Sequence, residues 1–169
     1  MNEPRIELRP ETKEDWWEVE ALLDLCFAPG RTALSSYRLR DDIPPVEGLS
    51  LVSHDELGIL TGAIRFWPVR VAGQPVLLLG PVAVHPTHQG EGLGALLIRS
   101  SLYRAAAKGW ERVLLVGDAP YYRRFGFTKL DKVVMPPPTN PDRVLGQELV
   151  FGAWKGVEGP VTRWDTVTD

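Results

Sequence analysis

The stretch from residue 76 to residue 116 most constrains how this chain can fold. Residues 76–84 are almost all apolar, which is typical of a strand buried on both faces of a covered sheet. Apolar residues then recur every three or four positions over residues 93–108, which predicts a helix that ends at Gly109. A second buried strand follows at residues 112–116. This strand, helix, strand crossover predicts an α/β fold with a mixed sheet and helices on both faces.

The remaining predicted elements flank this crossover. Strands are expected at residues 5–9, 49–53, 57–71, 127–134 and 148–151, and helices at residues 12–27, 33–40 and 121–125, with a proline-rich loop at 136–141. Gly73-Gln74 lies where a hairpin turn is expected. Gly80-Pro81 interrupts the central strand, and since proline in strands is confined to edges and bulges, we expect a local break in pairing there.

Length, cysteine content and charge exclude several classes of protein. A chain of 169 residues fits one domain, residues 1–169, better than two. Cys26 is the only cysteine, so no disulfide framework is possible and a reducing, cytoplasmic location is expected. No signal peptide and no apolar run of about 18 residues is present, which argues against a membrane partner. With a net charge of −3 and interspersed charges, nucleic acid is not an expected partner either.

A glycine-rich segment follows the central strand, with the sequence Val-Ala-Val-His-Pro-Thr-His-Gln-Gly-Glu-Gly-Leu-Gly-Ala over residues 82–95. Glycines let successive backbone N–H groups converge on one point. At a helix N-terminus these groups lack intrahelical partners and the helix dipole favours an anion. The segment therefore predicts a site for a pyrophosphate.

Other readings of the glycines fit less well. Gly90, Gly92 and Ala95 also match the dinucleotide fingerprint G-x-G-x-x-A, with Asp118 ending the next strand. However, about five residues separate the strand from the glycines, and Asp118 lies beyond the usual spacing of about 20 residues. No Gly-Lys-Ser or Gly-Lys-Thr follows, which excludes a kinase-type phosphate loop. An ordinary flexible turn would not explain three glycines opening a strongly apolar helix.

Two motifs resemble the GNAT superfamily of N-acetyltransferases. Its pyrophosphate loop reads Gln or Arg, two residues, Gly, one residue, Gly or Ala, which Gln89, Gly92 and Gly94 match, and Tyr-Arg-Arg-Phe-Gly-Phe over residues 122–127 is similar to its downstream tyrosine followed by Gly-Phe. The resemblance implies a sheet splayed apart beside residues 82–84, with acetyl-CoA as co-substrate in the cleft. The implied cofactor-binding residues are Val82, Ala83, Val84, Gln89, Gly90, Glu91, Gly92, Leu93, Gly94 and Ala95.

Tyr122 is the candidate catalytic residue. Attack on a thioester expels a thiolate, and a phenol with a pKa of about 10 is protonated at neutral pH and can donate a proton. By the resemblance, Tyr122 is the general acid. The alternative is that Tyr122 simply packs with Phe125 and Phe127 under the sheet. Asp118 departs from the asparagine common near this point in the family, and Asp-Ala-Pro is an efficient helix start.

Other chemistry-bearing residues are less informative. No general base for the incoming amine is marked out by spacing. His85 and His88 stand three residues apart, but without a third ligand they predict no metal site. Cys26 is placed in a helix far from the glycine motif, so no covalent nucleophile is expected. Trp67 shares a strand face with Ala63 and Arg65, where it either lines the acceptor site or packs.

Together these features predict an acetyl-CoA-dependent N-acetyltransferase that passes the acetyl group directly to an amine, either a small molecule or a peptide. A non-catalytic acyl-CoA-binding or sensing module is the alternative. By the resemblance, the variable segment 31–46 and the C-terminal third set the acceptor, whose identity the sequence does not indicate. Trp154 and Trp164 either shape the site or bury against a second subunit, so a homodimer is an open possibility.

Overall fold

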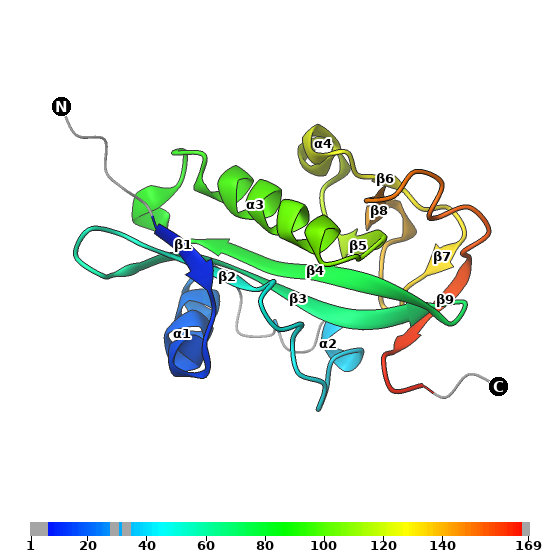
Figure 1. Cartoon of the computed structure of the whole chain (residues 1–169), viewed down its shortest axis with the longest axis horizontal. Helices are drawn as coiled ribbons and strands as arrows, with labels where there is room; N and C mark the ends of the chain where they lie inside the picture. The colour runs from blue at the N-terminus through cyan, green and yellow to red at the C-terminus, as the bar shows by residue number, and fades with distance from the viewer. Residues whose placement is uncertain (1–6, 28–30, 32–34, 167–169) are drawn as a thin grey trace.

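The computed structural model describes residues 7–27, 31 and 35–166, which form one mixed β-sheet covered by helices (Figure 1). Within these residues the sheet has nine strands, and the main path runs in the order β1-β2-β3-β4-β5-β8-β6, with β9 pairing both β3 and β7. The strands are β1 (Glu7–Pro10), β2 (Leu51–His54), β3 (Leu60–Val71), β4 (Gln74–Val84), β5 (Arg112–Val116), β6 (Thr128–Lys129), β7 (Val133–Val134), β8 (Val144–Glu148) and β9 (Gly159–Arg163). Strands β4 and β5 pair in parallel, whereas β3 and β4 pair antiparallel, so the predicted mixed sheet is confirmed.

Helices cover both faces of the sheet, as the sequence predicts (Figure 1). The helix α3 (Leu93–Ala107) lies on one face, and α1 (Trp16–Cys26) and α2 (Ser35–Arg38) lie on the other, while α4 (Ala119–Tyr122) follows β5. Successive side chains of β3 point to opposite faces of the sheet, so this strand contacts helices on both faces. Ile64 and Phe66 pack with α3, and Ala63 packs with α1. No helix in the described ranges is long and apolar enough to cross a membrane.

The predicted break in pairing lies in β4 beside β5. Gly80 and Pro81 together stand opposite Arg65 of β3, because Leu79 pairs with Phe66 and Val82 pairs with Ile64. This bulge shifts the alternation of side chains by one residue. Between β4 and β5 the described pairing covers only residues 77–78 against residues 113–114, so the two strands diverge beyond that point. The sheet is therefore splayed beside residues 82–84.

The C-terminal third differs from the sequence prediction. The strand expected over residues 127–134 is two strands, β6 and β7, that belong to different parts of the sheet. The strand expected at 148–151 is wrong, since β8 ends at Glu148, and Val150 and Phe151 are exposed in turns despite their apolar character. Strand β9 was not predicted, because its Gly159-Pro160 start is typical of a loop; it pairs with only three residues of β3.

Smaller shifts affect the other boundaries. The hairpin between β3 and β4 turns on Ala72 and Gly73, whose φ angles are 50° and 76°, and Gln74 already pairs with Val71. The turn predicted at Gly73-Gln74 therefore lies one residue earlier in the chain, at Ala72-Gly73. The helix predicted at 12–27 begins with a 3₁₀ turn, Lys13–Asp15, before α1. Of the helix predicted at 33–40, α2 occupies residues 35–38, and residues 33 and 34 lie outside the described residues, as do residues 5 and 6 of the first strand.

Candidate active site

The glycine-rich segment opens helix α3 with free backbone donors. Gly92 is the N-cap, in the left-handed conformation with φ 81°, and no side chain caps the helix there. The first intrahelical hydrogen bond is donated by the N–H of Leu96 to the Gly92 carbonyl, at 3.0 Å. The N–H groups of Leu93, Gly94 and Ala95 therefore precede the intrahelical ladder and are available to an anion.

The three glycines serve different purposes. Gly90 and Gly92 have φ angles of 85° and 81°, and a Cβ added at either would meet no atom within 4 Å. These positions need glycine for the backbone conformation, and the space above them is open. A Cβ at Gly94 would lie 3.4 Å from the Tyr121 hydroxyl oxygen and 3.7 Å from Val84 Cγ2. The helix start therefore lies against the end of β4 and against α4, which brings the two sequence motifs together.

The histidines of this loop are engaged locally. The Thr87 N–H donates to His85 Nδ1 at 3.2 Å, and His88 Nδ1 lies 3.1 Å from Glu91 Oε2. The described part of the chain contains no group of three His, Cys, Asp or Glu side chains that could hold a metal ion. Gln89 is exposed at the rim of the loop.

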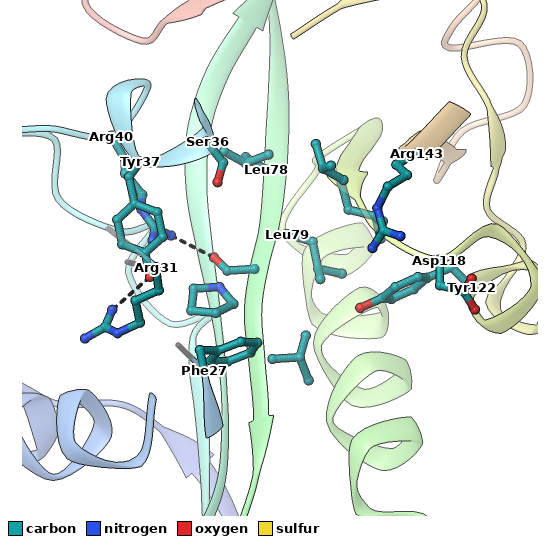
Figure 2. Close-up of a pocket in the computed structure, with 16 residues that line it drawn as sticks. Phe27, Arg31, Ser36, Tyr37, Arg40, Leu78, Leu79, Asp118, Tyr122 and Arg143 are labelled. Atoms are coloured by element: carbon teal, nitrogen blue, oxygen red, sulfur yellow. Dashed lines mark hydrogen bonds between the residues drawn. The ribbon is translucent and has the colours of Figure 1, made fainter. Parts of the chain in front are cut away.

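A cavity of roughly 320 Å³ opens where β4 and β5 diverge (Figure 2). Residues 78–82 of β4 form one wall and residues 115–118, at the end of β5, form the other. The α1–α2 region contributes Phe27, Arg31, Ser36, Tyr37 and Arg40, while Tyr122 and Arg143 close the opposite side. Of the predicted cofactor residues only Val82 lines this cavity; the loop residues from Gln89 to Ala95 lie outside it.

Tyr122 both packs and reaches the cavity. Its ring makes edge contacts with Tyr121 and Phe127, at centroid distances of 5.0 Å and 5.9 Å. Its hydroxyl points across the cavity toward β4 (Figure 2). Burial, and next the neighbouring Tyr121, raise the pKa of Tyr122 to about 12, against a smaller lowering by Arg143. The phenol therefore keeps its proton well above neutral pH and is available as a hydrogen-bond or proton donor.

Gly117 positions the Tyr122 ring, and nothing in the sequence pattern singles it out. A Cβ at Gly117 would lie 2.6 Å from Tyr122 Cε2 and 2.9 Å from Leu115 Cδ1. We expect Gly117→Ala to displace the ring. If Tyr122 is the general acid that the resemblance implies, kcat should then fall by about tenfold or more, because small misplacements of catalytic groups are costly. Acetyl-CoA affinity, measured by calorimetry, should change little.

A double variant provides the control for this effect. In the Tyr122→Phe background, Gly117→Ala should lower kcat only slightly further, because both changes act on one group. Independent, multiplicative effects of the two substitutions would show that Gly117 acts elsewhere.

Two side chains hold the bulge in β4 from the α2 side. Arg40 Nη1 and Trp67 Nε1 both donate to the Gly80 carbonyl, each at 3.0 Å. The Arg40 guanidinium lies 4.7 Å from the Trp67 ring centroid. Trp67 itself is 6 % exposed and does not line the cavity, so it packs behind the wall and supports Arg40 and the bulge.

Cys26 is closer to the glycine motif than its place in the sequence indicates. Its Sγ donates to the Val84 carbonyl at 3.4 Å, so the expectation that it lies far from the motif is wrong. Helix α1 packs against β4 and brings the end of the helix to this strand. Burial raises the pKa of the Cys26 thiol, which disfavours the nucleophilic thiolate. Cys26 also does not line the cavity.

Asp118 is the one acidic side chain among the residues that line the described cavity. Its Oδ2 accepts a hydrogen bond from the Tyr121 N–H at 3.2 Å and caps α4, the helix-start role predicted from Asp-Ala-Pro. It therefore stands where α4 presents Tyr122. No second carboxylate of the described cavity lining is available as a general base.

The fold and site together define a class of protein: an α/β protein with an uncapped helix start beside a split sheet and a tyrosine hydroxyl in the split. Comparison with known proteins assigns the family. Residues 47–129 match the family described as Acetyltransferase (GNAT) domain. The chain belongs to the GNAT family of acetyltransferases, and its predicted membership of this superfamily and its predicted acyltransferase class are confirmed.

Bacterial relatives support this assignment. The chain is 33 % identical over 122 residues to the uncharacterized N-acetyltransferase YhbS of Escherichia coli, covering 71 % of this chain and 72 % of YhbS. It is 36 % identical over 119 residues to the uncharacterized N-acetyltransferase YjhQ of E. coli, covering 68 % of this chain and 65 % of YjhQ.

Solved structures agree with the fold. A crystal structure of E. coli YhbS in complex with CoA aligns with a TM-score of 0.84 and 28 % identity over 96 % of this chain and 92 % of YhbS. A GNAT family acetyltransferase from Brucella melitensis in complex with acetyl-CoA aligns with a TM-score of 0.64 and 30 % identity, over 83 % of this chain and 94 % of that protein. GNAT enzymes use acetyl-CoA as co-substrate, so the predicted co-substrate is confirmed.

Proposed function

We propose that this protein transfers the acetyl group of acetyl-CoA directly to an amine that enters the cavity between β4 and β5. The observation that carries the proposal is the meeting of three features: the uncapped start of α3, the divergence of β4 from β5, and the Tyr122 hydroxyl in the cavity between them. The CoA and acetyl-CoA bound by the YhbS and Brucella proteins support the choice of donor.

In this proposal the donor follows the splayed strand. The pyrophosphate accepts hydrogen bonds from the N–H groups of residues 92–95, and Gln89, Gly90 and Glu91 form the rim. The amide-rich pantetheine arm runs beside Val82, Ala83 and Val84, where β4 has no described pairing with β5. It would hydrogen-bond this edge as an added strand does.

The chemistry needs one proton donor at the sulfur. The neutral amine nitrogen attacks the thioester carbonyl carbon, the C–S bond breaks, and the thiolate takes the proton of the Tyr122 hydroxyl. The amine loses a proton to water or to a base not yet assigned, and the phenolate regains one from solvent. Transfer is direct in this scheme, since Cys26 lies outside the cavity with a raised thiol pKa.

A non-catalytic acyl-CoA-binding module is the competing function. It needs the phosphate site and the split sheet, but it has no use for a proton donor in the split. The Tyr122 hydroxyl favours the enzyme because it is a protonated donor that points into the cavity, where the sulfur of a bound thioester would lie in this proposal.

We expect acetyl-CoA to stabilise the protein against heating and NAD to leave it unchanged. A ligand that binds only the native state at 100 times its Kd adds about 2.7 kcal/mol, which corresponds to several degrees in Tm for a chain of this size. Thermal-shift measurements with acetyl-CoA, CoA, NAD and NADH test this directly. A shift with NAD or NADH and none with acetyl-CoA would reverse the choice between the two readings of the glycines.

A further inference from the structure

The cavity between β4 and β5 carries an excess of positive charge. Three arginines line it, Arg31, Arg40 and Arg143, against one carboxylate, Asp118. Arg31 is already neutralised, because its Nε lies 3.0 Å from Asp24 Oδ1 and its Nη2 lies 3.1 Å from Glu20 Oε2. The excess therefore comes from Arg40 and Arg143.

Arg40 is a buried cation without a carboxylate partner within 4.0 Å among the described residues. It is 7 % exposed, its Nη1 bonds the neutral Gly80 carbonyl, and its guanidinium lies 3.3 Å from the centre of the Tyr37 ring. Burial lowers the pKa of Arg40 to about 10, so the side chain is still charged at neutral pH. A buried charge without a counter-ion is costly, and it marks a place where an anion would be stabilised.

Arg143 stands on the opposite side of the same cavity. Its guanidinium points toward Tyr122, and it also has no carboxylate partner in the described part of the chain (Figure 2). Arg40 and Arg143 come from segments that are distant in sequence, yet both line the space into which the Tyr122 hydroxyl points.

The phosphates of CoA do not account for these two arginines. The proposed pyrophosphate site is the start of α3, and none of residues 89–95 lines the cavity. The rest of the lining is mainly apolar, including Phe27, Leu79 and Pro81. A ligand that matches this cavity is thus anionic at one end and apolar along its body.

We propose that the acceptor is a small amine that also carries a carboxylate and an apolar group, with Arg143 receiving the carboxylate and the positive charge of Arg40 on the opposite wall favouring its entry. This inference rests on the proposed acetyl transfer and names the substrate class of that reaction. The cavity volume of roughly 320 Å³ corresponds to about ten liquid waters of about 30 Å³ each. This is enough space for a molecule of the size of an amino acid. Arginine is the side chain best suited to bind a carboxylate, through two parallel hydrogen bonds.

Matched acceptors test the charge requirement. Phenylalanine, leucine and methionine are each assayed with acetyl-CoA. Each is compared with its amide and with its decarboxylated amine, and rates are compared at equal concentrations of the neutral amine. We expect kcat/KM to be at least tenfold higher for the acid of at least one set. Equal or better use of the uncharged partners in all three sets would overturn the inference while leaving acetyl transfer standing.

Variants assign the effect to the two arginines. Arg143→Gln, at an exposed position, should raise the KM of the preferred acid by about tenfold and reduce its preference over the amide, whereas the KM of the amide should change little. Arg40→Gln removes only the second positive charge of the cavity, so it should reduce the preference for the acid to a smaller extent, in a variant whose melting temperature shows that it is folded. The matched control is Arg38→Gln, an exposed arginine of α2 that bonds the Pro137 carbonyl and does not line the cavity. An unchanged acid-to-amide ratio in Arg143→Gln would contradict the assignment.

Product binding separates this inference from the proposed function. The protein is first saturated with CoA, so that the sites for the CoA phosphates are occupied. Calorimetry then compares the binding of N-acetylphenylalanine with that of N-acetylphenethylamine. Tighter binding of the anionic product, lost in Arg143→Gln, supports the inference even if turnover is slow. Failure of CoA itself to bind would instead refute the proposed function.

Discussion

Replacing Tyr122 by phenylalanine is expected to lower turnover by roughly ten- to a thousandfold while changing acetyl-CoA affinity little. The change removes one proton donor and keeps the ring that packs against Tyr121 and Phe127. The loss should appear in kcat, because thiolate charge develops only during the reaction. Steady-state kinetics with an accepted amine measure it; without one, slow hydrolysis of acetyl-CoA followed as thiol release serves.

The matched control is Tyr103→Phe, the same chemical change at a tyrosine of α3 that is 79 % exposed. Its turnover should equal that of the wild type. The pH profile provides a second measurement, because a phenol with a pKa of about 12 stays protonated up to pH 10. The wild-type rate should therefore not fall between pH 7 and pH 10 through loss of the acid. Full activity of Tyr122→Phe would reject the catalytic role and leave CoA binding as the supported function.

Gly92→Val is expected to weaken CoA binding by about a hundredfold or more. With φ at 81°, a β-branched residue at the α3 N-cap is strained by about 1–3 kcal/mol and must either shift the loop or project into the open space above it. That space is where the phosphate oxygens would lie. Isothermal titration with CoA gives the affinity, and thermal melting shows whether the variant is folded.

Gly58→Val separates backbone strain from contact with the ligand. Gly58 has φ 79°, and a Cβ there also meets no atom within 4 Å, but it lies in the β2–β3 turn, outside the glycine-rich loop. It should lose stability much as Gly92→Val does and keep its affinity for CoA. If both variants bind CoA like the wild type, the phosphate-loop assignment is wrong.

Those parts of the fold with strong local signals were predicted from sequence. The period of residues 93–108, the apolar run at 76–84 and the Gly80-Pro81 break correspond to α3, β4 and the bulge in β4. These signals are local, since burial on both faces and helical spacing leave a pattern in consecutive residues. The prediction failed in the C-terminal third because strands of two residues carry no period, and because Val150 and Phe151 are apolar yet exposed.

The residues of the candidate site also fall into those that local sequence motifs predicted and those that they did not. Tyr122 and the residues from Gln89 to Ala95 were predicted as motifs, and the structure places both beside the divergence of β4 and β5, although their roles stay predictions. Arg40, Gly117 and Arg143 were not predicted as site residues. Each depends on contacts between segments far apart in the chain, such as the 40 residues that separate Arg40 from Gly80. No periodicity or motif reports such contacts.

The cavity at the divergence of β4 from β5 is lined from both faces of the sheet, by the α1–α2 side and by the side that carries Tyr122. Helices α3 and α2 cover opposite faces of the sheet (Figure 1), so in the proposed reaction a donor held at the start of α3 would lie on one face and an acceptor entering past α2 would arrive from the other. The two substrates would then occupy separate entrances and meet at a single carbon inside the sheet. Neither would have to leave before the other enters, so the reaction would proceed through a complex that holds both substrates at once.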